Sequence, residues 1–148
     1  MNRKSLLSIV FAVVFACAAI PFASAKQANQ LTKVTFTQSV EIPGRVLPAG
    51  TYWLMLVGDT FNRNTVRIYS ADMSTVYLTQ VTVSSQHQNR ADGTAITFAE
   101  RNASQPEALL EWRCSGEAVG HEFQYNKTEQ RELAQDRQET VLANRAGL

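Results

Sequence analysis

The sequence is poor in cysteine and histidine and has no excess of either charge. It contains two cysteines, two histidines, fourteen basic and thirteen acidic residues, and the charges are scattered along the chain. Without a basic stripe the chain is not expected to bind nucleic acid. Cys114 is the only cysteine after residue 25, which excludes an intrachain disulfide framework, and with His121 it lacks the spacing of a metal site. We therefore expect no disulfide, no metal and no cofactor.

Long apolar runs are also missing, apart from one near the amino terminus. Two basic residues precede an uncharged apolar run from residue 5 to 20, and "ASA" follows at 23–25, which is the pattern of a secretory signal. The run falls short of the ~20 residues that span a bilayer and ends at Pro21, which favours cleavage after Ala25 over a retained anchor. Lipidation of Cys17 is a further alternative. We expect a secreted or periplasmic protein with no transmembrane segment after cleavage.

Cleavage leaves 148 − 25 = 123 residues, the ordinary size of one domain. We interpret residues 1–25 as signal peptide, 26–127 as a β-domain and 128–148 as a C-terminal tail. The tail has good helix formers but few large apolar residues, so it predicts a short helix or a mobile segment.

Alternating apolar and polar residues predict short strands between turn-prone segments. Strands about ten residues apart, with no helix between them, favour an all-β fold built as an antiparallel β-sandwich, with a small closed β-barrel as the alternative. Gln38 is the one residue that breaks the alternation of the first segment. The expected strands are 34–42, 45–47, 51–57, 65–70, 75–84, 94–100, 108–114 and 119–125.

The stretch "EIPGRVLPAGTYWLMLVGD", residues 41–59, is the sharpest folding signal. Pro43-Gly44 and Pro48-Ala49-Gly50 are turn sequences, because proline presets φ and glycine accepts a positive φ. The strand at 51–57 that follows is apolar on both faces, which predicts a position in the middle of a sheet.

The candidates for chemistry are few, and most favour a structural interpretation. His121 and Glu122 are adjacent on a strand and point to opposite faces, so His121 is expected to be a buried core histidine. His87 lies in a polar segment and is expected to be solvated. Glu100 and Glu111 could approach each other across two strands as an acid–base pair, but ion pairing with arginines such as Arg101 is commoner. No G-x-S-x-G elbow is present and Cys114 is in phase with apolar residues, so we expect no enzymatic activity.

The segment "GDTFNRN", residues 58–64, is the best candidate for binding. An aromatic ring beside planar amides and a guanidinium suits sugars or extended peptides, and such groups often lie on loops. The alternative is an ordinary hairpin loop whose Phe61 packs on the core. The candidate binding residues are Phe61, Asn62, Arg63 and Asn64.

Three stretches carry a resemblance to known sequences: "VTFTQSVEIPGRVLPAGTYWLML", "ITFAERNASQPEALLEW" and "VGHEFQYNK". Together they resemble a family of small secreted bacterial proteins of unassigned function, over about residues 34–127, most specifically in "IPGxxLPAGTY" and "GHEFxY". The resemblance implies an extracytoplasmic β-domain and supplies no catalytic residue. Asn126 departs from it, since the usual pattern there is "FxYPK".

The combined interpretation is a secreted or cell-envelope β-sandwich with a non-catalytic binding or structural role. An envelope glycan or a protein is the expected partner. One alternative is a small β-barrel that carries an apolar ligand, and another is an enzyme of unrecognised type. The aromatic residues that could line the cavity of such a carrier are Tyr52, Trp53, Phe98, Trp112 and Phe123.

Overall fold

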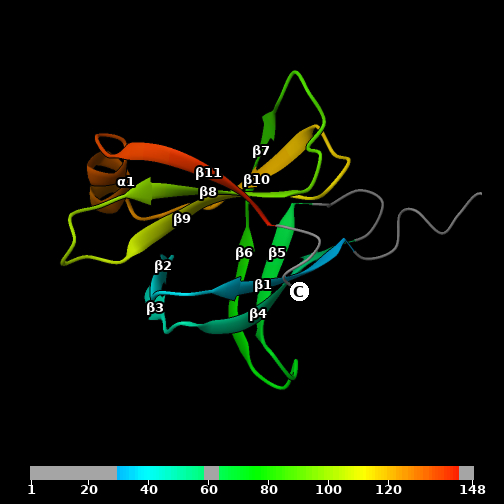
Figure 1. The fold of residues 1–148 in the computed structure, drawn as a ribbon, viewed down its shortest axis with the longest axis horizontal. Helices are drawn as coiled ribbons and strands as arrows, with labels where there is room; N and C mark the ends of the chain where they lie inside the picture. The colour runs from blue at the N-terminus through cyan, green and yellow to red at the C-terminus, as the bar shows by residue number, and fades with distance from the viewer. Residues whose placement is uncertain (1–29, 59–63, 144–148) are drawn as a thin grey trace, which may run out of the picture.

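The computed structural model describes residues 30–58 and 64–143. Within these residues the chain forms two β-sheets and one short helix, and neither sheet closes into a barrel (Figure 1). The all-β prediction is confirmed as a two-sheet fold, and the closed-barrel alternative is not found. No helix in the described ranges is both long and apolar enough to cross a bilayer.

The first sheet is antiparallel, with the strand order β1-β4-β5-β6. The doubly apolar strand β4 lies between β1 and β5, as predicted for the middle of a sheet. Tyr52 and Leu54 point into the core and are 4% and 0% exposed, whereas Trp53 on the other face is half-buried. The four strands are β1 (Leu31–Phe36), β4 (Gly50–Val57), β5 (Thr65–Ser70) and β6 (Val76–Val81).

The second sheet has seven strands with the main order β11-β8-β9-β10-β7, and β2 and β3 extend from β9. The pairing of β2 with β9 is parallel and the other pairings are antiparallel, so the sandwich is not purely antiparallel. The seven strands are β2 (Val40–Ile42), β3 (Arg45–Leu47), β7 (Val83–Gln86), β8 (Thr94–Glu100), β9 (Glu107–Arg113), β10 (Val119–Glu122) and β11 (Arg137–Ala143).

Two segments that were expected to be single strands are each divided between the two sheets. The segment 34–42 is interrupted at 37–39, the site of the irregular Gln38, so that β1 and β2 belong to different sheets. The segment 75–84 changes sheet at Thr82, which separates β6 from β7. The predicted inward residues of the first segment are nevertheless all buried: Val34, Phe36, Val40 and Ile42.

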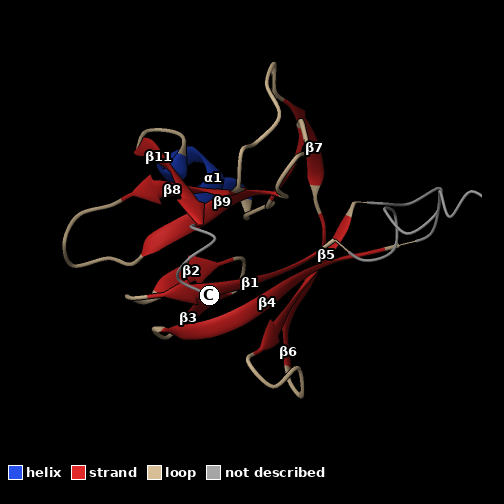
Figure 2. Cartoon of the chain, turned by 45° about the vertical axis from the view of Figure 1, so that its right-hand side comes forward, coloured by secondary structure: helices blue, strands red, loops and turns tan. Residues whose placement is uncertain are grey.

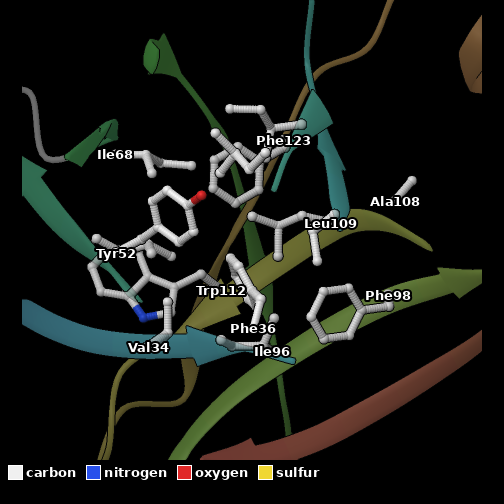
Figure 3. Close-up of a cluster of buried hydrophobic side chains, with 14 of the residues drawn as sticks. Val34, Phe36, Tyr52, Ile68, Ile96, Phe98, Ala108, Leu109, Trp112 and Phe123 are labelled. Carbon is white, nitrogen blue, oxygen red and sulfur yellow. The ribbon is translucent and has the colours of Figure 1, made fainter. Parts of the chain in front are cut away.

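The core lies between the two sheets (Figures 2 and 3). Tyr52 and Ile68 of the first sheet face Leu109 and Trp112 of β9 and Phe123, which directly follows β10. All five side chains are 4% exposed or less. Burial of this apolar surface is the main source of stability in a domain without disulfides.

The turns of the opening stretch form largely as expected. Pro43-Gly44 joins β2 to β3, and Gly44 has a φ of 82°, the left-handed conformation that glycine accepts without strain. Gly50 also has a positive φ, of 158°, but it is already part of β4. The expected turn at residues 48–50 is therefore completed before Gly50.

The C-terminal segment forms the helix α1 (Lys127–Leu133) and then strand β11. The short helix is confirmed, whereas the strand was not predicted. Figures 1 and 2 show α1 against the seven-stranded sheet, on the side away from β1 and β4. Arg101, with a side chain only 8% exposed, pairs with Glu41 and lies 3.6 Å from Asp136, which ties the turn before β11 to β2.

Candidate functional site

A polar pocket of about 330 Å³ lies on the outer face of the seven-stranded sheet, next to α1. We call it the α1 pocket. Its sheet side is formed by residues of β8, β9, β10 and β11, and its other side by the helix. The residues that line it include Thr97, Glu111, Glu122, Gln130, Leu133 and Thr140.

The helix is placed by a cap at its start and an apolar anchor at its end. Asn126 accepts hydrogen bonds of 3.0 Å from the backbone N–H groups of Thr128 and Glu129, and the Glu129 carboxylate accepts from the N–H of Asn126. This is a capping box, and an N-cap contributes about 1 kcal/mol. At the other end Leu133 is 3% exposed. Asn126, which departs from the "FxYPK" pattern, therefore has a clear role as the cap.

Glu111 is the central buried group of the α1 pocket. It is 8% exposed and lies on β9 between the core residue Trp112 and the bulged Leu110. The hydroxyl of Ser85 donates a hydrogen bond of 2.5 Å to Oε2 of Glu111. Nε2 of His87 lies 2.9 Å from Oε1 and 3.1 Å from Oε2 of the same carboxylate. Two groups from the end of β7 thus hold one carboxylate at the pocket wall.

Gly120 on β10 makes this arrangement possible. It lies opposite Ser85 in the β7–β10 register, between the strands that carry Ser85 and Glu111. A Cβ atom at this position would lie 2.5 Å from the carboxyl carbon of Glu111 and 2.5 Å from Oγ of Ser85, which is closer than such atoms approach. The missing side chain of Gly120 is the space that the Glu111 side chain occupies.

Ser85, His87 and Glu111 contain the residue types of a nucleophilic triad but not its geometry. In a triad the serine and the carboxylate contact different nitrogens of the imidazole, so that the ring relays a proton between them. Here Oγ of Ser85 lies 3.4 Å from Nε2 of His87, the same nitrogen that contacts Glu111. The serine hydroxyl already donates to the carboxylate. This arrangement fixes a carboxylate in position rather than activating a hydroxyl.

The predicted binding residues fall largely outside the part of the chain that the structure describes. Phe61, Asn62 and Arg63 lie outside the described residues, so their binding role stays a prediction. Asn64 is described, and its carbonyl oxygen accepts 2.7 Å hydrogen bonds from both the N–H and the hydroxyl of Thr82. Its side-chain oxygen accepts from Ser84 at 2.9 Å. These bonds connect the start of β5 to the crossing point between β6 and β7.

The two histidines differ in burial and in how they compare with their predictions. His121 is 5% exposed and its Nδ1 lies 3.3 Å from the hydroxyl of Thr82, which confirms the prediction of a hydrogen-bonded core histidine. Burial lowers the pKa of His121 below the usual 6.5, and Glu111 and Glu117 oppose this shift in part. His87 was expected to be solvated, and its side chain is 36% exposed but also pairs with Glu111. The sequence gives no local signal for this pair, because 24 residues separate its members.

Glu100 and Glu111 are not brought together. The register of β8 and β9 places Glu111 opposite Thr97, and Glu100 lies 3.7 Å from Arg137 on β11. Cys114 is buried and free, as predicted. No group of three or more histidine, cysteine or acidic side chains in residues 30–58 and 64–143 has an arrangement that could hold a metal ion.

The aromatic residues considered for an apolar carrier do not line a shared cavity. Tyr52, Phe98, Trp112 and Phe123 belong to the packed core, whereas Trp53 lies on the outer face of β4 and donates to the carbonyl of Ala71. Rings in this core pack against each other, as Phe36 does edge-on against Phe98 at 6.0 Å between centroids. Comparison of the chain with protein-family models, with curated proteins and with solved structures found no match.

Proposed function

We propose that this protein is a secreted or periplasmic, non-catalytic binding protein whose ligand occupies the α1 pocket. The pocket supplies the main support, because a concave site with a few converging polar groups is the usual form of a small-molecule site. The secretory pattern of residues 1–25 supports the location.

Glu111 is the single observation that favours a binding role. A carboxylate that is 8% exposed is costly to bury, and Ser85 and His87 offset this cost with hydrogen bonds. The glycine at position 120 is needed for the arrangement. A chain that only had to fold could place an apolar residue here, so the buried carboxylate favours recognition at the pocket wall.

The test is to block the pocket and follow a ligand retained from the producing cells. Ala134 and Gln138 line the pocket, and Ala134→Trp and Gln138→Trp each place an indole in it. Gln135 is exposed next to Ala134 and does not line the pocket, so Gln135→Trp is the matched control. Native mass spectrometry of protein purified from its own cells should show a small bound molecule in the parent and the control, and not in the two pocket variants.

Thermal melts of all variants separate loss of binding from loss of folding. Phe61→Ala and Arg63→Ala test the loop at 58–64 as the alternative binding site. Retention of the ligand by both pocket variants, with its loss from the two loop variants, would reject the pocket and move the site to the loop. A measured turnover of the bound molecule would reject the non-catalytic role.

A further inference from the structure

We infer that the α1 pocket recognises a small protonated amine with a polar body, such as an amino sugar or a short diamine. This inference rests on the proposed function, since it assigns a ligand class to the same pocket. It is carried by the charge, the hydrogen-bonding groups and the size of the pocket.

The pocket holds two carboxylates, and the one basic side chain that lines it, His87, is paired with Glu111. Glu111 and Glu122 lie directly opposite each other in the β9–β10 register, and both carboxylates line the pocket. No lysine or arginine is among the described residues that line it. Carboxylates placed together in a partly enclosed site favour a cation and exclude an anion, because opposite charge in a bound partner offsets their mutual repulsion.

The two carboxylates differ in how much of their hydrogen-bonding capacity is free for a ligand. Glu111 is held by Ser85 and His87, whereas the Glu122 carboxylate has no hydrogen-bond or ion-pair partner within the described ranges. Glu122 is exposed at the rim and Glu111 is buried at the wall. A primary ammonium group has three donors, so it can bond the free rim carboxylate while the wall carboxylate adds to the attraction.

Besides the apolar side chains of Leu110, Phe123 and Leu133, the lining has amides and hydroxyls that suit a polar body. Nε2 of Gln130 on the helix donates to Oε1 of Gln124 at 3.2 Å, and the hydroxyls of Thr97 and Thr140 are 2.9 Å apart on the sheet side. Such amides and hydroxyls can exchange their mutual bonds for bonds to ligand hydroxyls. A volume of about 330 Å³ is at the small end for ligand sites, which fits a monosaccharide or a short diamine.

The experiment is calorimetric titration of the purified protein with three probes at a pH where amines are protonated. Glucosamine and putrescine carry the amine on different bodies, and N-acetylglucosamine is the neutral match for glucosamine. Both amines should bind, and glucosamine should bind about tenfold more tightly than its acetylated form, the usual scale for a charged hydrogen bond. Added salt should weaken the binding of the amines.

Glu122→Gln keeps the shape of the rim side chain and removes its charge. It should weaken the amines about tenfold and leave N-acetylglucosamine unchanged. Glu132→Gln is the matched control, since Glu132 is exposed on α1 and does not line the pocket. Tight binding of N-acetylglucosamine that is independent of Glu122 would overturn the amine inference while supporting a ligand site in the pocket. Failure of both amines to bind would overturn the inference alone, because retention of a native ligand tests the proposed function separately.

Discussion

The hydroxyl of Tyr52 donates a hydrogen bond of 2.7 Å to the carbonyl oxygen of Pro48, four residues earlier in the chain. Tyr52 is the tyrosine of "LPAGTY" and is 4% exposed at the start of the central strand β4. The bond closes the turn onto the strand, and the ring packs against Phe36 at 5.7 Å between centroids. The motif therefore joins a turn to the core through one side chain.

Tyr52→Phe should lower the free energy of unfolding by about 1 kcal/mol, because the part-buried hydrogen bond to the Pro48 carbonyl is lost while the ring remains. Urea melts measure the change. Tyr77→Phe is the control, since Tyr77 packs edge-on against Tyr52 and its hydroxyl has no hydrogen bond in the described part of the chain. Equal effects of the two substitutions would mean that the bond to Pro48 does not stabilise the fold.

Gly120→Ala should destabilise the protein by ~1–3 kcal/mol, because the new methyl group overlaps Glu111 and Ser85. A double-mutant cycle tests whether the overlap with Glu111 causes this loss of stability. Gly120→Ala should cost less when Glu111→Ala is already present, since part of the obstruction is then gone. Additive losses in urea melts would show that Gly120 and Glu111 do not compete for this space.

Cys114 should react slowly with thiol reagents in the folded protein. Burial raises the pKa of Cys114 to about 12, so the reactive thiolate is scarce at neutral pH. Labelling is followed on a chain with Cys17→Ser, so that one thiol is present, with and without urea. Rapid labelling of the native protein would contradict the burial of this side chain.

His121 should make stability depend on pH. Its folded-state pKa is lowered below 6.5, so the unfolded chain binds the proton more readily. The stabilisation is complete above the unfolded pKa and is lost as the pH falls from about 6.5 through the folded-state value. Urea melts of the parent and of His121→Gln on both sides of this window isolate the contribution. If the parent loses no more stability than the variant on acidification, His121 does not make stability depend on pH.

The exported protein should begin at Lys26. Cleavage after Ala25 follows from the small-x-small pattern at residues 23–25. Amino-terminal sequencing of material from outside the cytoplasm is the measurement. An intact Met1 or a lipid on Cys17 would exclude this processing.

The sequence predicted strands well because burial follows a local period of two. Val34, Phe36 and Val40 were placed on the correct face by alternation alone. The two-residue alternation is the same in both sheets. Alternation therefore could not show that the chain changes sheet at Thr82 or near Gln38. Turn chemistry likewise predicted positive φ values at Gly44 and Gly50, but it did not predict that Gly50 already pairs with Phe36 as part of β4.

Strand β11 and the α1 pocket could not be predicted because both depend on long-range strand pairing. Residues 137–143 contain helix formers, and Val141 and Leu142 are 46% and 54% exposed, so no buried face marks the segment as a strand. Its pairing with β8 overrides the local preference. The cluster around Glu111 needs side chains from β7, β9 and β10, whose order is set by long-range pairing and is not written in any local pattern.

Strand β11 also has a consequence for the solubility of the chain. It pairs with β8 along seven residue pairs, from Arg137 opposite Glu100 to Ala143 opposite Thr94. Without it, the N–H and C=O groups along one side of "TAITFAE" would be free, beside a strand rich in β-branched and aromatic residues. Such an open edge is a template on which other chains add as strands and begin to aggregate. Strand β11 takes the edge position itself with a more charged sequence, so a chain cut before Arg137 would be more exposed to self-association even with its core intact.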